Sequence, residues 1–194
     1  MRFGTTLDRF MHHNRQTPAL LWSFAYFFCL LSGYYVLRPV RDAMGASSEV
    51  EAVFPSAMIA FFAAHGIPLK DIVLQVLATC TFVFILIAQP LYGALVSKYT
   101  RRVFLPVLFG FFIACLFIFY ALFHSNVTGR GMAFFVWVTV FNVFSVSVFW
   151  SFMADVFNSR EARKYYGYIG AAGTVGAFTG PTLTRTLAVE VGTA

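Results

Sequence analysis

The sequence predicts an all-α, multi-pass membrane protein, a bundle of about five spanning helices. Of its 194 residues, 59% are hydrophobic and 19% aromatic, whereas 11% are charged. A soluble domain carries about 25% charged residues. The mean hydropathy is +0.75, and the apolar residues fall into separate runs of about 20, the length at which a helix crosses the hydrocarbon core of a bilayer. Together these observations exclude an ordinary soluble domain.

The first predicted span is the apolar run at residues 19–37, which follows a polar, basic segment at residues 1–18. No small-residue cleavage site follows the run, so an uncleaved span is favoured over a signal peptide. Pro39 disfavours a helical conformation at the residue before it, and the helix is therefore expected to end there. Residues 1–18 are expected to form a solvated cytoplasmic tail, because their two adjacent histidines lack the spacing of metal ligands.

Residues 53–64 are also apolar, but twelve residues are too few to cross a bilayer as a helix. Acidic residues precede the run, a glycine and a proline follow it, and Pro55 stands near its start. An interfacial or re-entrant helix fits this length better. The remaining spans are predicted at residues 71–96, 103–123, 132–156 and 166–187.

The loops between the spans differ in charge. Two loops are basic and a third, residues 124–131, holds a single arginine; the basic ones contain Lys98, Arg101 and Arg102, and Arg160, Arg163 and Lys164. Five spans place the N-terminus and both basic loops on one side, which the positive-inside rule makes cytoplasmic. We therefore expect an integral, multi-pass membrane protein with its N-terminus in the cytoplasm.

Two charged groups stand at unusual depths. Arg38, Arg41 and Asp42 lie within one turn at the outward end of the first span, where charge is costly unless it is paired or reaches the interface. Interfacial anchoring is one explanation. Their outward position violates the positive-inside rule, however, and this favours a functional role.

The second of these groups is Asp155, near the cytoplasmic end of the fourth span. Lys98, Arg101 or Arg102 would lie on the same membrane face, so a cytoplasmic gate salt bridge is one hypothesis. The alternative is an exposed carboxylate just beyond the hydrocarbon core.

The last span contains five glycines three and four residues apart. A helix face lined with hydrogens lets two backbones approach closely, so we predict a tight helix contact in preference to a substrate contact. Pro181 directly follows and predicts a kink, because it removes a backbone donor. No strand precedes these glycines, which excludes a dinucleotide-binding loop. They are Gly167, Gly170, Gly173, Gly176 and Gly180.

The sequence lacks the residue patterns of metal sites, enzyme active sites and nucleic-acid-binding surfaces. Cys29, Cys80 and Cys115 stand in separate apolar runs with no metal-ligand spacing, and are predicted to be apolar fillers. The sequence shows no Ser/His/Asp set, paired carboxylates or metal-ligand cluster, so we expect neither an enzyme nor a bound cofactor or metal. The Lys and Arg residues form no continuous basic face, and nucleic-acid binding is not expected.

One loop carries a resemblance to a known superfamily. Residues 93–102, GALVSKYTRR, resemble the loop motif that the major facilitator superfamily carries between its second and third spans. The matching positions are Gly93, Lys98, Arg101 and Arg102. Ser97 and Thr100 replace the usual aspartate and glycine, so the helix-locking role of that acid is not expected here.

Two further stretches narrow the resemblance. LRPVRDAMG after the first span, and FWSFMADVFNSREARKYYGYIGAAGTVGAFTGP at residues 149–181, resemble the ADP/ATP translocase family of plastids and intracellular bacteria and its relatives in free-living bacteria. The resemblance implies the N-terminal part of a major facilitator transporter. It implies a basic residue tied to transport at Arg41. It also implies an acidic residue in the fourth span, where this chain has Val138, Thr139 and Asn142.

The leading hypothesis is therefore a secondary transporter that moves an organic anion by alternating access, with ATP/ADP exchange among the candidates. Arg38 and Arg41 would bind phosphate or carboxylate oxygens, because a guanidinium presents a planar fork to two oxygens. Asp42 would hold that fork in position or release it. Asn142 would hydrogen-bond the substrate, or else bond to a neighbouring helix.

The expected partners follow from this hypothesis. They are the lipid bilayer, a small anionic substrate, and a missing C-terminal half or partner chain, because superfamily members bind substrate between two six-helix halves. The alternative hypothesis is a non-transporting membrane module, or a truncated fragment, that acts only through helix association.

Overall fold

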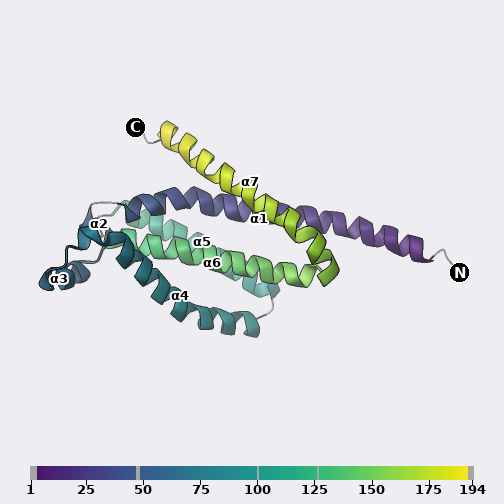
Figure 1. Ribbon diagram of the computed structural model, residues 1–194, viewed down its shortest axis with the longest axis horizontal. Helices are drawn as coiled ribbons and strands as arrows, with labels where there is room; N and C mark the ends of the chain where they lie inside the picture. Colours follow the sequence, from purple (N-terminus) through teal and green to yellow (C-terminus); the bar gives the residue numbers. More distant parts are fainter. Residues whose placement is uncertain (1–3, 47–48, 100, 126, 192–194) are drawn as a thin grey trace. The chain divides into compact units, whose positions relative to one another are not determined.

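The computed structural model describes residues 4–46, 49–99, 101–125 and 127–191. For residues 4–17, 95–97, 101–102 and 190–191 it describes the backbone alone. The described chain is helical and contains no strand. Figure 1 shows its elements: α1 Gly4–Gly45, α2 Val50–Val53, α3 Ser56–Ala64, the 3₁₀ turn η1 Leu69–Asp71, α4 Val73–Lys98, α5 Arg101–Phe123, α6 Arg130–Val156 and α7 Ser159–Val191.

Four helices in the described chain are long and apolar enough to cross a membrane. They are Pro18–Gly45 of α1, Val73–Ala94 of α4, Val103–Phe123 of α5, and α6. The predicted all-α, multi-pass membrane fold is therefore confirmed. The fifth predicted span lies inside α7, which is 33 residues long but is not among the four, because glycine and threonine replace many aliphatic residues along it.

Helix α1 does not end before Pro39, and that expectation was wrong. It is a single helix of 42 residues that begins inside the predicted tail at Gly4 and continues to Gly45. Proline removes one backbone hydrogen bond, but spanning helices tolerate this loss because neighbouring groups satisfy the backbone. As a result, Arg38, Arg41 and Asp42 lie on a regular helix instead of a loop.

The segment at residues 53–64 is split at Pro55. The backbone is extended at Phe54 and Pro55, so the apolar run forms the end of α2 and then the nine residues of α3. Nine residues rise about 13.5 Å as a helix, too little for a bilayer core of about 30 Å. This agrees with the expectation that the segment does not span.

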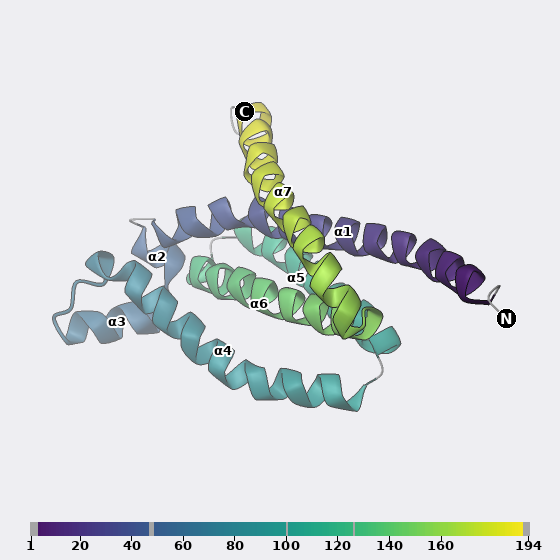
Figure 2. The same cartoon turned by 45° about the vertical axis from the view of Figure 1, so that its right-hand side comes forward.

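The chain divides into two compact units, and we describe each by itself. Unit 1 comprises the described parts of Met1–Leu37 and Ser145–Ala194, and unit 2 comprises those of Arg38–Phe144. In unit 1, α7 crosses α1 (Figures 1 and 2). Phe27 of α1 stacks on Phe149 of α6 with ring centroids 4.4 Å apart, and fully buried Met153 and Ile169 complete this core.

The crossing of α1 and α7 depends on three glycines. A Cβ atom at Gly173 would lie 2.5 Å from Phe27 Cε1, one at Gly176 would lie 2.9 Å from the Phe28 carbonyl oxygen, and one at Gly180 would lie 2.8 Å from the Ser32 carbonyl oxygen. These contacts leave no room for a methyl group. The predicted tight helix contact is therefore present in unit 1.

Hydroxyl groups flank this contact. Ser32 Oγ lies 2.7 Å from Thr179 Oγ1, and Thr184 Oγ1 donates to the Val36 carbonyl at 3.1 Å. By contrast, Gly167 and Gly170 have no atom within 4 Å of a Cβ position, so the predicted glycine face is divided. Helix α7 remains helical through Pro181.

In unit 2, aromatic residues join α4, α5 and α6. Tyr92 stacks on Phe144 at 4.8 Å, and Phe112 packs edge-on against Phe141 at 4.8 Å. A second core forms beneath α2 and the start of α4, and its buried members are Val53, Phe54, Leu69, Val73, Leu77 and Phe135. Phe135 is therefore held between this core and the end of α1.

Candidate functional site

The candidate site is centred on Arg41, which lies near the end of α1 in unit 2. Its side chain is 14% exposed. Nη1 donates a hydrogen bond to Thr139 Oγ1 of α6 at 3.3 Å, and Cζ lies 5.2 Å from the ring centroid of Phe135. A cation over an aromatic face within about 6 Å is attracted to the ring. Two residues of α6 therefore hold a guanidinium that comes from α1.

The local sequence explains this arrangement. Gly45 lies four residues after Arg41 and therefore on the same face of α1. It is buried, and a Cβ there would lie 3.1 Å from Phe135 Cε2, so glycine lets the ring approach α1. One turn along α6, Thr139 donates its hydroxyl proton to the Phe135 carbonyl at 2.9 Å. Its oxygen then presents a lone pair to Arg41.

The rest of the site consists of charges from one turn of α1. Asp42 Oδ1 accepts from Nε and Nη2 of Arg41 at 2.9 and 2.6 Å. Asp42 Oδ2 lies 3.6 Å from Nε of Arg38. The Arg38 and Asp42 side chains are 45% and 52% exposed. The structure therefore places the three predicted charged residues in one group. Arg41, the inner arginine, is held by α6, whereas Asp42 and Arg38, the outer arginine, are exposed.

This group can bind an anion. Two guanidiniums and one carboxylate leave one net positive charge, and arginine stays protonated in proteins. Charge-assisted hydrogen bonds to carboxylate or phosphate are about twice as strong as neutral ones. No group of three His, Cys, Asp or Glu in the described chain could hold a metal ion.

Asn142 lies one helical turn beyond Thr139 on α6, in the same unit. Its Oδ1 atom is buried and has no hydrogen-bond partner among the described residues, so the structure shows no bond from this oxygen to a neighbouring helix. Val138 is fully buried in the core. Of the three residues named at this level of α6, Thr139 is the one that contacts Arg41.

Among the residues of the hypothetical gate, the structure describes the side chains of Lys98 and Asp155. Gly93 is exposed on α4 with open space around it. Lys98 is exposed, with Nζ 5.9 Å from the ring centroid of Tyr99. Asp155 is exposed in unit 1, whereas Lys98 belongs to unit 2. The side chains of Arg101 and Arg102 lie outside the described residues, so the gate salt bridge stays a prediction.

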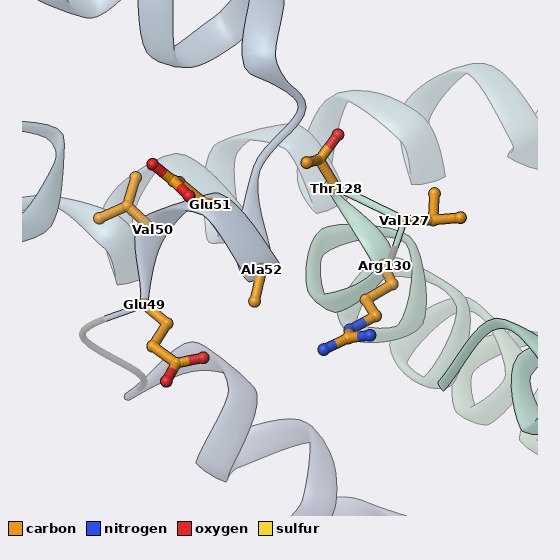
Figure 3. A pocket seen from close by; sticks show the side chains of 7 residues that line it. All are labelled: Glu49, Val50, Glu51, Ala52, Val127, Thr128 and Arg130. Carbon is orange, nitrogen blue, oxygen red and sulfur yellow. The ribbon is translucent and has the colours of Figure 1, made fainter. Parts of the chain in front are cut away.

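Unit 2 also contains an open pocket of about 550 Å³ between α2 and the start of α6. Figure 3 shows its lining side chains, in which Glu51 of α2 and Glu49, the residue before α2, point in different directions. Arg130 lines the opposite wall and donates to the Ser125 carbonyl. The pocket shares no lining residue with the Arg41 group.

Sequence analysis missed three residues of the site: Gly45, Phe135 and Thr139. Thr139 and Arg41 are 98 positions apart, and no local pattern links them. One signal was available, because Thr139 is one of the few polar residues in this span and lies three residues from Asn142. It was noted only as a residue that is not acidic.

In comparisons with known proteins, no family model, no curated protein and no solved structure matches the chain.

Proposed function

We propose that this integral membrane protein acts in a secondary transporter of organic anions, and that Arg41 is its main anion-binding residue. The observation that carries the proposal is the setting of Arg41. Its guanidinium is 14% exposed, it comes from one spanning helix, and it is held by Thr139 and Phe135 of another. An ionisable residue in a spanning segment is by default a functional-site candidate.

The geometry supports a binding role better than an anchoring role. An interfacial anchor extends its charged group into water, as Arg38 does with 45% exposure. Arg41 instead turns toward α6 and donates hydrogen bonds to Asp42 and Thr139. Such immobilisation is useful where the charge must meet a ligand in a fixed orientation.

The resemblance to the ADP/ATP translocase family supports a nucleotide as one candidate substrate, since Arg41 is the matching basic position. Thr139 stands at the level where that family is expected to carry an acid. Because Thr139 is neutral, the charge of Arg41 is balanced by Asp42 or by the ligand. We propose alternating access between two halves of a larger assembly as the mechanism.

The test is uptake of radiolabelled ADP and succinate into proteoliposomes that contain the active assembly, with the chain present in wild-type or variant form. Arg41→Ala should abolish uptake while the protein still inserts and is still helical by circular dichroism. Lys70→Ala removes an exposed cation from the same unit and should leave uptake unchanged. Equal uptake by the wild type and Arg41→Ala would overturn the assignment.

A second candidate function is helix association without transport, and it rests on the glycines of α7. Gly173, Gly176 and Gly180 already pack α7 against α1 within the chain, whereas Gly167 and Gly170 leave open space for a partner helix. Small residues of this kind let membrane helices approach closely. In a pure interaction module, Arg41→Ala would leave partner association unchanged and no anion would bind. Anion binding that depends on Arg41 therefore separates the two functions.

A further inference from the structure

Asp42 occupies one of the two edges of the Arg41 guanidinium at which an anion can accept two hydrogen bonds. Its Oδ1 atom accepts from both Nε and Nη2, at 2.9 and 2.6 Å, and these two nitrogens form one edge of the guanidinium fork. Its Oδ2 atom lies 3.6 Å from Nε of Arg38. Nη1 of Arg41 is directed to Thr139 at 3.3 Å. One carboxylate thus fills the Nε/Nη2 edge of Arg41 and also lies beside Arg38.

We propose that Asp42 is a tethered competitor for the anion site, and that the substrate is an anion of at least two charges that displaces it. This inference rests on the proposed function. Every ligand must break the contacts between Asp42 and Arg41, and the free energy that this requires is the same for each ligand. A singly charged anion restores only what Asp42 supplied, whereas a doubly charged one can bind Arg41 and Arg38 together and gain more attraction.

The exposures show which group would move. Arg41 is 14% exposed and is held by α6, whereas Asp42 is 52% exposed and has room to turn away from Arg41. Ion pairs at such exposed positions are weak, so a charged ligand can compete with them. Arg38 is half-exposed and four residues from Asp42, so it is placed to bind the second charge of the ligand. The substrate would replace the carboxylate without moving the inner guanidinium.

The experiment compares two probes of similar shape, sulfate with two charges and methyl sulfate with one. Binding to the chain in lipid nanodiscs is measured as direct binding of radiolabelled sulfate and as its displacement by methyl sulfate. The wild type should bind sulfate at least about tenfold more tightly than methyl sulfate. Asp42→Asn should raise the affinity for both probes about fivefold, the size expected for loss of one competing exposed ion pair.

Two matched variants complete the test. Asp42→Glu keeps a negative charge beside Arg41, so it should bind sulfate more weakly than Asp42→Asn does. Glu51→Gln removes an exposed carboxylate that is not part of the site and should change binding less than twofold, which separates local competition from a general change in charge. If Asp42→Asn weakens or does not alter binding, or if the wild type binds both probes equally, the inference is wrong.

The proposed function is judged by a different variant. Arg41→Ala should lose sulfate binding whatever the role of Asp42. If Arg41→Ala binds sulfate as the wild type does, the anion site itself is refuted. If Arg41→Ala loses binding but Asp42→Asn gains none, the anion site remains and only the competitor is refuted.

Discussion

The crossing of α1 and α7 makes a sharp prediction about Gly176. A Cβ atom there would lie 2.9 Å from the carbonyl oxygen of Phe28 and 3.0 Å from the amide nitrogen of Ser32. Both are backbone atoms of α1 and cannot move as a side chain could. Gly176→Ala therefore forces the helices apart and should destabilise the protein by about 1–3 kcal/mol, the usual cost of overpacking.

Gly170 is the matched control on the same helix. No atom lies within 4 Å of its Cβ position, so Gly170→Ala meets no steric barrier. Replacing glycine by alanine inside a helix stabilises it by roughly 0.5–1 kcal/mol. The same substitution, six residues apart, should therefore change stability in opposite directions.

The measurement is unfolding of the purified protein in mixed dodecyl maltoside and SDS micelles, followed by circular dichroism. The midpoint should fall for Gly176→Ala and rise slightly for Gly170→Ala. Equal midpoints for the two variants would show that α7 does not pack on α1 through this face, and would refute the reasoning.

Two further predictions concern unit 2. Thr139→Val removes the oxygen that accepts a hydrogen bond from Arg41, so the affinity for ADP should fall about two- to tenfold, the effect of one net hydrogen bond. Thr139→Ser keeps the hydroxyl and should keep the wild-type affinity. Equilibrium dialysis measures the affinity, and a wild-type value in Thr139→Val would contradict the prediction. Gly66 and Gly129 both have positive φ, 67° and 83°, but a Cβ at Gly129 would also lie 3.1 Å from the Pro55 nitrogen. Gly66→Ala should therefore lower the stability by about 1–2 kcal/mol, and Gly129→Ala should lower it more because of the contact with Pro55. A higher unfolding midpoint for Gly129→Ala than for Gly66→Ala in the same micelles would contradict this ranking.

Much of the fold could be predicted from the apolar runs, because a helix that crosses a bilayer needs about 20 consecutive, mostly apolar residues. The three central spans were predicted within a few residues of α4, α5 and α6, whereas the break at Pro55 between α2 and α3 was not predicted. Pro39 misled the prediction, since its local preference against helix is overridden within a long spanning helix. Local preference and tertiary setting disagreed there, and the tertiary setting prevailed.

The site was less predictable than the fold. Arg38, Arg41 and Asp42 could be selected because charge in an apolar setting is costly and therefore conspicuous. Their partners could not be selected. Phe135 is one of 25 phenylalanines, and its contact with Arg41 depends on how two distant helices pack. Gly45 lacked any periodic pattern, unlike the glycines of α7, of which the structure packs three against α1 and leaves two open.

The most direct test of the central claim is equilibrium binding of ADP to the chain in lipid nanodiscs, with adenosine as the uncharged control. The wild type should bind ADP and not adenosine. Arg41→Ala should lower ADP affinity about ten- to hundredfold, the contribution expected of one charge-assisted contact. ADP affinity unchanged in Arg41→Ala, or adenosine bound as tightly as ADP, would contradict the assignment of Arg41 as the anion-binding residue.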